Sequence, residues 1–591
     1  MPIILGYPLI NWYIGFVLFG LFCLFVKIHI ITPQGPHQTW IIKNLPVNGE
    51  NKDIIWDEIF KLEDGSVSIS FFNTFRNMLG DIFLCITPLV LIYWIVKKFI
   101  KKNDFNAANK KSFTAYTLVN VSIFFLIFAI MAYIAVAYRY DMINTVVQIE
   151  LYRDLYNLDL YSITIKVMIL LTSIFILHNS RTYILLHSSQ MLEFTVLLTL
   201  AIFFLSVLVS SNDLMVMFIS IIGFSLNMYV LLMSDFDRRA SLEAGIKYFY
   251  LSAFSSGLLI SGIWLCYIIF FNTHFIDIRL ILEQWLRLPE NPILANQGIL
   301  QIMIYSIVYG FLFKLAAFPC HLWAPEVYEG SPNPIMAFFI LPVKIAVFAV
   351  FIRLITNIFK DIYSLSSYIL WFSAWTSMLW GCYGAFTELK LRKFIAFSSI
   401  NQMGFLLIGV SCGTFIGIRA TLIYLFIYVI MNCGFLQIFL TTYADKNNLT
   451  LDFITDFKYF ARDNKLLAVL LITILFSMAG IPPLAGFFGK YFLFAASIKS
   501  GYYFLVIIGM LTSLISTFYY IRIIKVMWFD EQHTILPSIK FINTMDRPGR
   551  LTYFSLIVFI ILFILFINSI FSFANLITIS CLMLLIFSFS S

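Results

Sequence analysis

The chain has 591 residues, of which 61% are hydrophobic and 12% are charged, and its formal net charge is +8. The charged fraction is about half that of a soluble domain, and the apolar residues fall in many runs of about 20, the length that spans a bilayer. These features exclude a soluble globular protein, and a membrane β-barrel would show short segments of alternating polarity instead. The sequence therefore predicts an all-α polytopic membrane protein.

Several classes of function are excluded by what the chain lacks. Its basic residues gather in loops between apolar runs, which is the usual topology bias of membrane proteins and not a nucleic-acid-binding surface. The closest two of its eight cysteines, Cys412 and Cys433, are 21 positions apart, so an iron–sulfur cluster held by this chain alone is not expected. There is also no P-loop and no Gly-x-Gly-x-x-Gly turn. Any nucleotide or redox centre is therefore expected in a partner.

The N-terminal region contains three apolar runs. The first, Ile3–Val26, has no clear small-residue cleavage site, so we interpret it as a transmembrane helix and not as a signal peptide. The polar loop Lys27–Asn77 separates it from a span at Met78–Val96. Six lysines between positions 97 and 111 face one acid, Asp104, which predicts the cytoplasmic or matrix side for that loop. The acidic loop after the span Tyr116–Tyr138 fits the opposite side.

The rest of the chain continues the alternation of apolar spans and polar loops, which gives about 15 spans in all. A final apolar tail, Ile570–Phe589, is either a short span or an interfacial segment. The remaining spans are expected at Ser162–Leu177, Leu192–Val209, Leu214–Met233, Ala244–Phe271, Leu300–Pro319, Ile335–Thr356, Ser367–Phe386, Phe394–Cys412, Ile418–Thr441, Leu466–Ile498, Tyr502–Trp528 and Leu551–Ile567.

Two apolar segments are interrupted by prolines, and each carries a lysine. Leu300–Pro319 contains Lys314 and leads into a stretch with four prolines, each of which removes a backbone donor. Leu466–Ile498 is too long for one straight span, is interrupted by two prolines and carries Lys490. Paired interruptions of this kind are typical of repeats in transporters, although proline kinks are also common in membrane helices.

Three lysines, Lys314, Lys344 and Lys490, lie well inside apolar spans. A lysine near a helix end extends to the lipid headgroups, but these three are too deep for that. For Lys166 and Lys247, which are nearer to span ends, a headgroup contact and a functional role both stay open. Burial favours the neutral form of a lysine and a nearby carboxylate favours the charged form. A row of such groups linked by water therefore has the chemistry of a proton relay.

Other polar residues near the interrupted segments have two interpretations each. His321 titrates near neutral pH, so it either joins a relay or structures the proline-rich turn. Glu326 and Glu329 in the same turn are expected near the aqueous surface. Gln402, in the span Phe394–Cys412, either holds a polar link between helices or serves packing.

Four stretches together resemble the antiporter-like membrane subunits of respiratory complex I, and among these the mitochondrial subunit 2 with its bacterial counterpart, chain N. The resemblance covers about Tyr161–Trp528, whereas Asn77–Tyr138 fits by hydrophobic pattern only. The stretches are Lys314–Pro332 (Lys-Leu-Ala-Ala-Phe-Pro-Cys-His-Leu-Trp-Ala-Pro-Glu-Val-Tyr-Glu-Gly-Ser-Pro), Ser241–Phe249 (Ser-Leu-Glu-Ala-Gly-Ile-Lys-Tyr-Phe), Ala396–Gly404 (Ala-Phe-Ser-Ser-Ile-Asn-Gln-Met-Gly) and Ala479–Lys490 (Ala-Gly-Ile-Pro-Pro-Leu-Ala-Gly-Phe-Phe-Gly-Lys).

The resemblance implies a core of 14 transmembrane helices with two inverted five-helix repeats that each contain a broken helix. Ile3–Val26 would then be an added N-terminal span. The implied divisions are an N-terminal span and loop at 1–77, N-terminal core helices at 78–190, repeats at 191–357 and 366–528, and a C-terminal loop and helix at 529–591.

The resemblance also implies roles for individual residues. Lys314 matches the lysine of the first half-channel, Lys344 the connecting lysine, and Lys490 the lysine of the second half-channel. Lys247 matches the lysine that follows Leu-Glu-Ala-Gly-Ile. Gln402 stands where many members have histidine, so a hydrogen-bonding link replaces a titratable one.

One departure from the family concerns the first half-channel. Members place a glutamate mid-span in the helix before Lys247, but here Ile222 takes that position, and no acid lies between Asp213 and Asp235. We therefore expect that Lys314 has no carboxylate within salt-bridge distance.

The implied function is a proton-translocating subunit of complex I. This chain would bind no cofactor, because NADH, FMN, the iron–sulfur clusters and ubiquinone belong to partner subunits. The expected partners are other complex I membrane subunits, the lipid bilayer and accessory proteins at the 27–77 loop and the termini, with no nucleic acid. An AT-rich compositional bias favours the mitochondrial inner membrane over a bacterial plasma membrane. Two alternatives stay open: a free-standing cation/proton antiporter of the same fold, and a scaffold subunit with a degenerate channel.

Overall fold

The computed structural model describes residues 77–100, 107–139, 149–151, 155–181, 183, 192–235, 238–287, 297–444, 452–458, 460–529, 541–543 and 547–582. The expected N-terminal span Ile3–Val26, nearly all of the loop that follows it, and the middle of the lysine-rich loop lie outside these residues.

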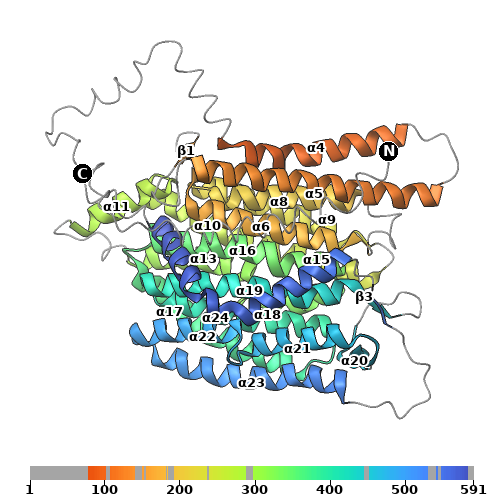
Figure 1. The fold of residues 1–591 in the computed structure, drawn as a ribbon. Helices are drawn as coiled ribbons and strands as arrows, with labels where there is room; N and C mark the ends of the chain where they lie inside the picture. Colours follow the sequence, from red (N-terminus) through yellow and green to blue (C-terminus); the bar gives the residue numbers. More distant parts are fainter. Residues whose placement is uncertain are drawn as a thin grey trace.

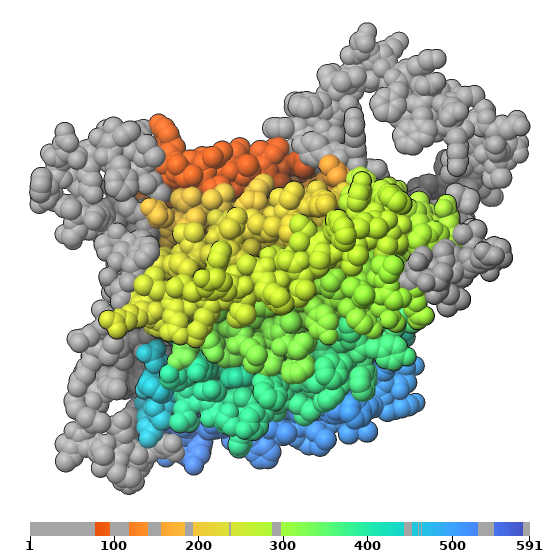
Figure 2. All heavy atoms as spheres, turned by 180° about the vertical axis from the view of Figure 1, so that it is seen from behind, coloured from red at the N-terminus to blue at the C-terminus, as the bar shows by residue number. Residues whose placement is uncertain are grey.

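The helices lie side by side, and chain order runs across the molecule from the N-terminal helices at one edge to α23 (Tyr503–Trp528) at the other (Figures 1 and 2). An N-terminal group forms the first edge. Its elements are α4 (Leu79–Ile100), α5 (Ala107–Arg139), a two-stranded hairpin of β1 (Ile149–Leu151) and β2 (Tyr156–Leu158), and α6 (Leu160–Asn179).

Two sets of five crossing segments follow, and the fourth segment of each set is broken. The first set comprises α8 (Leu192–Ser210), α9 (Leu214–Leu232), α10 (Arg239–Phe270), the pair α13 (Gln297–Leu315) and α14 (Trp323–Gly330), and the continuous run α15 (Asn333–Phe338), η1 (Phe339–Val343), α16 (Lys344–Arg353) and η2 (Leu354–Ile358). The second set comprises α17 (Tyr363–Thr387), α18 (Leu391–Ser411), α19 (Phe415–Thr441), the pair α21 (Lys465–Ala479) and α22 (Ala485–Lys499), and α23. Because five crossings separate α8 from α17, the two sets are inverted relative to each other. The exact repeat boundaries stay predictions.

Eleven helices of the described residues are long and apolar enough to cross a membrane, by length and composition. With α4, α17 and the α21–α22 pair they account for the 14 crossings expected of the core. The described chain is therefore a multi-pass, almost wholly helical membrane protein, as its sequence predicts. The short elements between crossings are α11 (Phe275–Arg287), η3 (Ile454–Phe457), α20 (Phe460–Asp463), and the strands β3 (Thr442–Ala444) and β4 (Phe541–Asn543), which pair with each other.

The C-terminal region differs from the expectation. A span ending at Ile567 with a separate apolar tail from Ile570 is wrong, because α24 (Arg547–Leu582) is one continuous helix of 36 residues. It bends as it crosses the second set, where it packs on α19, α21 and α22, and it also contacts α6 (Figure 1). Asn568 and Ser569 do not end it, because an α-helix satisfies its backbone groups internally whatever the side chain.

The centre of the molecule is the run from α15 to η2, which is enclosed by protein along its whole length, Asn333–Ile358. Its side chains have no lipid or aqueous face. A polar side chain on this run is therefore surrounded by other helices, which is the setting of Lys344.

Candidate functional site

Lys490 lies at the break between α21 and α22. Its Nζ donates hydrogen bonds to two backbone carbonyls at the end of α21, those of Ala479 (2.9 Å) and Met478 (3.2 Å). Carbonyls in the last turn of a helix have no intrahelical donor and carry partial negative charge. The ammonium group of Lys490 is thus held by a helix C-terminus, with the Phe405 ring 4.9 Å from its Nζ.

Two glycines make this geometry possible. Gly480 ends α21 in the left-handed conformation, with φ +90°, which glycine adopts at no steric cost. Gly486 lets the start of α22 approach α21, because a Cβ there would lie 1.8 Å from the Ser477 carbonyl oxygen. The sequence therefore fixes both the interruption and the close approach of its two halves.

Lys314 lies in the last turn of α13, before the other break, and is buried. Its Nζ donates to the Ser252 hydroxyl of α10 (2.7 Å), and the Tyr229 hydroxyl of α9 donates to the same oxygen (2.8 Å). Among the described residues no carboxylate forms an ion pair with Lys314. This agrees with the expectation drawn from Ile222.

Lys344 begins α16, directly after a π-helical turn that contains Pro342. Its side chain is 1% exposed, and its Nζ has no hydrogen-bond partner among the described residues. The three deep lysines are thus all buried, and none is paired with a carboxylate in this part of the chain.

Lys247 has a different setting. Its side chain is 40% exposed, and its Nζ forms ion pairs with Glu243 of the same helix (2.6 Å) and with Glu326 of α14 (2.7 Å). Lys247 is thus held by two carboxylates, whereas Lys314 bonds to Ser252 further along the same helix α10. The exposure of Glu326 agrees with its expected place near an aqueous surface.

His321 and Gln402 are both buried. The His321 ring stacks on Phe318, with ring centroids 5.3 Å apart, in the turn between α13 and α14. Gln402 accepts a hydrogen bond from the Tyr424 hydroxyl, so it links α18 to α19. Whether either residue takes part in a relay stays a prediction.

Where α14 ends and α18 begins, Glu329 joins Lys390 and Lys393. Partial burial opposes ionisation, but hydrogen bonds from both lysines hold the pKa of Glu329 below its ordinary value. The same pairing raises the pKa of Lys390. These charges connect the two five-helix sets at the membrane boundary.

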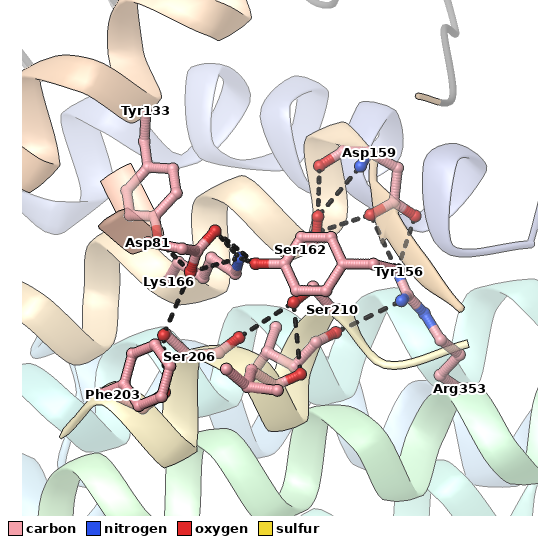
Figure 3. A network of polar contacts seen from close by, with 12 residues as sticks. Asp81, Tyr133, Tyr156, Asp159, Ser162, Lys166, Phe203, Ser206, Ser210 and Arg353 are labelled. Atoms are coloured by element: carbon pink, nitrogen blue, oxygen red, sulfur yellow. Dashed lines mark hydrogen bonds and ion pairs between the residues drawn. The ribbon is translucent and has the colours of Figure 1, made fainter. Parts of the chain in front are cut away.

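Two buried ion pairs escaped the sequence analysis (Figure 3). Lys166 of α6 pairs with Asp81 of α4 (3.0 Å), and Arg353 at the end of α16 pairs with Asp159, which precedes α6 (2.6 Å). Lys166 is fully buried, so a headgroup contact is excluded for it. No group of three or more histidine, cysteine or acidic side chains placed to hold a metal ion exists among the described residues.

A family model described as NADH:quinone oxidoreductase/Mrp antiporter, transmembrane, matches residues 211–516. NADH-quinone oxidoreductase subunit N of Pelagibacter ubique is 38% identical over 384 residues, which cover 65% of this chain and 79% of that relative. NADH-ubiquinone oxidoreductase chain 2 of Marchantia polymorpha is 35% identical over 499 residues, which cover 84% of this chain and 96% of that relative. The chain belongs to this family.

Solved structures of the same fold include chains from two assemblies. One is respiratory complex I from Thermus thermophilus with bound aureothin. Its chain is 20% identical with a TM-score of 0.65, and the match covers 83% of this chain and 98% of that chain. The other is the Mrp complex from Dietzia sp. Its chain is 16% identical with a TM-score of 0.67, and the match covers 86% of this chain and 97% of that chain. At these identities the likeness shows the fold alone.

The family match and the geometry divide the charged residues into two groups. Residues 211–516 include Lys247, Lys314, Lys344 and Lys490. Asp81 and the other N-terminal members of the ion pairs in Figure 3 precede the matched region.

Proposed function

We propose that this chain is a proton-translocating membrane subunit of an NADH–quinone oxidoreductase, respiratory complex I. In this proposal NADH oxidation and quinone reduction, with NADH, FMN, iron–sulfur clusters and ubiquinone, belong to partner subunits, and this chain carries out no redox step. Its place is the mitochondrial inner membrane, beside other complex I membrane subunits. Accessory proteins would bind the polar N-terminal loop and the termini.

The observation that carries the proposal is the arrangement of three buried lysines, one at each helix break and one on the enclosed central run, that form no ion pair with a carboxylate of the described residues. A charged group at such a position in a membrane is costly unless its surroundings compensate it. A shift of the surrounding groups therefore changes how readily each lysine holds its proton. Movement of the partner subunits would supply that shift, and the lysines would release and take up protons in response.

The residues around each lysine suggest how the response differs from site to site. At Lys490 the compensating groups are helix-end carbonyls, so a change in the angle of the α21–α22 break would strengthen or remove them. At Lys314 the neighbour is the neutral hydroxyl of Ser252. Lys344 has no hydrogen-bonding neighbour among the described residues, so water is the natural carrier of protons to and from it.

A free-standing cation/proton antiporter of the same fold is the second candidate, favoured by the structural likeness to a chain of the Mrp complex. The sequence relatives favour the complex I subunit, because they are named as subunits of that enzyme and match this chain over most of their own length. A scaffold role, motivated by Ile222, is the third. Purification of this chain as part of an NADH-oxidising assembly or as a lone active transporter separates the first two candidates.

The test of proton translocation replaces Lys314 or Lys490 by methionine in the assembled complex. Proton uptake into proteoliposomes is measured together with NADH oxidation. We expect both variants to move fewer protons per electron than the unmodified complex. Lys499→Met is the matched control, since Lys499 lies on the same helix α22 but is exposed. An unchanged proton-to-electron ratio in both test variants contradicts the proposal and favours the scaffold role.

A further inference from the structure

A buried polar cluster occupies the junction of the N-terminal helices with α8 (Figure 3). Its centre is the Asp81 carboxylate, which accepts hydrogen bonds from Lys166 Nζ (3.0 and 3.1 Å), the Tyr133 hydroxyl (2.6 Å) and the Ser206 hydroxyl (3.2 Å). The Tyr156 hydroxyl bonds to the same carboxylate and accepts from Lys166. We call these five residues the N-terminal cluster.

The cluster is built from five different elements. Asp81 comes from α4, Tyr133 from α5, Tyr156 from β2, Lys166 from α6 and Ser206 from α8. Both side chains of the Asp81–Lys166 pair are buried, with 7% and 0% exposure, which holds for no other lysine–carboxylate pair among the described residues. The other lysine pairs, which involve Lys247, Lys390 and Lys393, are between 26% and 48% exposed on the lysine side.

The cluster also lies close to one end of the bundle. Asp81 is in the first turn of α4, and Lys166 is roughly 9 Å along α6 from its first residue, at 1.5 Å per residue. Tyr133 is in the last two turns of α5, and Ser206 is in the last two turns of α8. All four helices therefore bring these residues toward the same face, where the β1–β2 hairpin lies. Tyr156 is itself part of that hairpin, so the hairpin contributes one hydroxyl to the cluster.

The cluster adjoins a second polar group that leads toward the centre of the molecule. Ser210 of α8 donates to the Ser206 carbonyl (3.1 Å), and Arg353 donates to the Val209 carbonyl (3.3 Å) while it pairs with Asp159. Arg353 ends α16, the helix that Lys344 begins. Asp159 and Arg353 are thus the charged groups nearest to the cluster outside its own members.

We propose that Asp81, Lys166 and the hydroxyls of Tyr133 and Tyr156 form a proton-exchange site on the hairpin side of the N-terminal helices. This inference rests on the proposed function and adds a site to it. The cluster contains a buried lysine–carboxylate pair, which Lys314 does not form with any acid among the described residues.

The exchange is balanced in three steps. The Lys166 ammonium gives one proton to a water molecule on its inward side, so that an N–H bond breaks, an O–H bond forms on the water, and an amine remains beside the Asp81 carboxylate. A proton from the opposite side forms an O–H bond on Asp81, reached through the tyrosine hydroxyls. Transfer of that proton breaks the O–H bond, forms a new N–H bond on Lys166 and restores the ion pair. One proton has then crossed the site, and no redox partner is needed.

The competing role is a structural clamp, and two variants separate it from proton exchange. In Lys166→Arg the ion pair keeps its charges, but a guanidinium does not release its proton near neutral pH. In the double variant Asp81→Asn and Lys166→Gln both charges are removed together, which buried ion pairs often tolerate. A clamp predicts normal pumping in both variants. Proton exchange predicts that both assemble and oxidise NADH but move fewer protons per electron.

The measurement is the proton-to-electron ratio in proteoliposomes, normalised to assembled complex, with Lys490→Met measured alongside. Normal ratios in Lys166→Arg and in the double variant, with a lowered ratio in Lys490→Met, overturn this inference and leave the proposed function standing. Normal ratios in all three overturn this inference, and they contradict the proposed function as well when Lys314→Met also pumps normally.

If neither cluster variant assembles, Tyr133→Phe decides. It keeps the ring and removes one hydroxyl that donates to Asp81. Proton exchange predicts slower pumping with a shifted pH profile, and a profile identical to that of the unmodified complex overturns the inference.

Discussion

The substitution Gly480→Ala tests whether the helix-end carbonyls at the second break hold Lys490. Gly480 has φ +90°, and an alanine in the left-handed conformation costs roughly 1–2 kcal/mol. The new Cβ would lie 3.1 Å from both Cδ and Nζ of Lys490, so the lysine must shift by a few tenths of an ångström. Its hydrogen bond to the Met478 carbonyl is already 3.2 Å long. Losing such a bond from a charged donor costs about 1.5–3 kcal/mol.

The matched control for this substitution is Gly501→Ala. Gly501 has φ +81° and no atom within 4 Å of the added Cβ, so it carries the backbone cost without the contact. We expect a destabilisation of about 2.5–5 kcal/mol for Gly480→Ala and about 1–2 kcal/mol for Gly501→Ala, from the terms above. Thermal unfolding of the purified complex measures the stability, and proteoliposomes measure protons per electron. Equal losses of stability and unchanged pumping in both variants would refute the role assigned to the carbonyls.

Two further predictions concern charges outside the relay. Arg353→Met leaves the Asp159 carboxylate buried without its cation, so we expect the free energy of unfolding, measured by thermal unfolding, to fall by about 3–5 kcal/mol. Adding Asp159→Asn should restore part of this loss. Equal losses in the single and double variants would count against the ion pair. Lys390 and Lys393 hold the pKa of Glu329 below its ordinary value, so the ionised Glu329 stabilises the fold above about pH 4.5, and this contribution is lost as the pH falls through the lowered pKa. Glu329→Gln should therefore flatten the acid limb of a plot of stability against pH. An unchanged acid limb would contradict the pairing.

The sequence predicts the helical membrane fold and both breaks because their signals are local. Prolines and Gly480 interrupt apolar runs at positions that can be read directly, and Lys314 and Lys490 stand beside those interruptions. The partners of the lysines are not local. Ser252 is 62 positions from Lys314, and nothing in its surroundings distinguishes it from other serines in apolar helices.

The same limit explains why the N-terminal cluster was missed. Asp81 is 85 positions from Lys166, and an acid in the first turn of a helix is commonly a favourable interaction with the helix end. Only the folded arrangement shows that α4, α5 and α8 carry an acid, a tyrosine and a serine toward Lys166. The short helix α11 escaped for another reason, since 13 residues with mixed charges resemble a polar loop when spans of about 20 apolar residues are sought.

The buried charges of this chain therefore differ in what compensates them, and this difference bears on how they respond to movement. The Asp81–Lys166 and Asp159–Arg353 pairs carry opposite charges together, so a small displacement of one helix leaves each pair largely intact. Lys490 depends on two carbonyls whose direction is set by the angle at one glycine. Among the described residues, Lys314 bonds to one hydroxyl, and Lys344 has no hydrogen-bonding neighbour. A conformational signal that reaches the breaks therefore changes the surroundings of Lys490 most, which makes the second break the stronger candidate for the step where movement is converted into proton release.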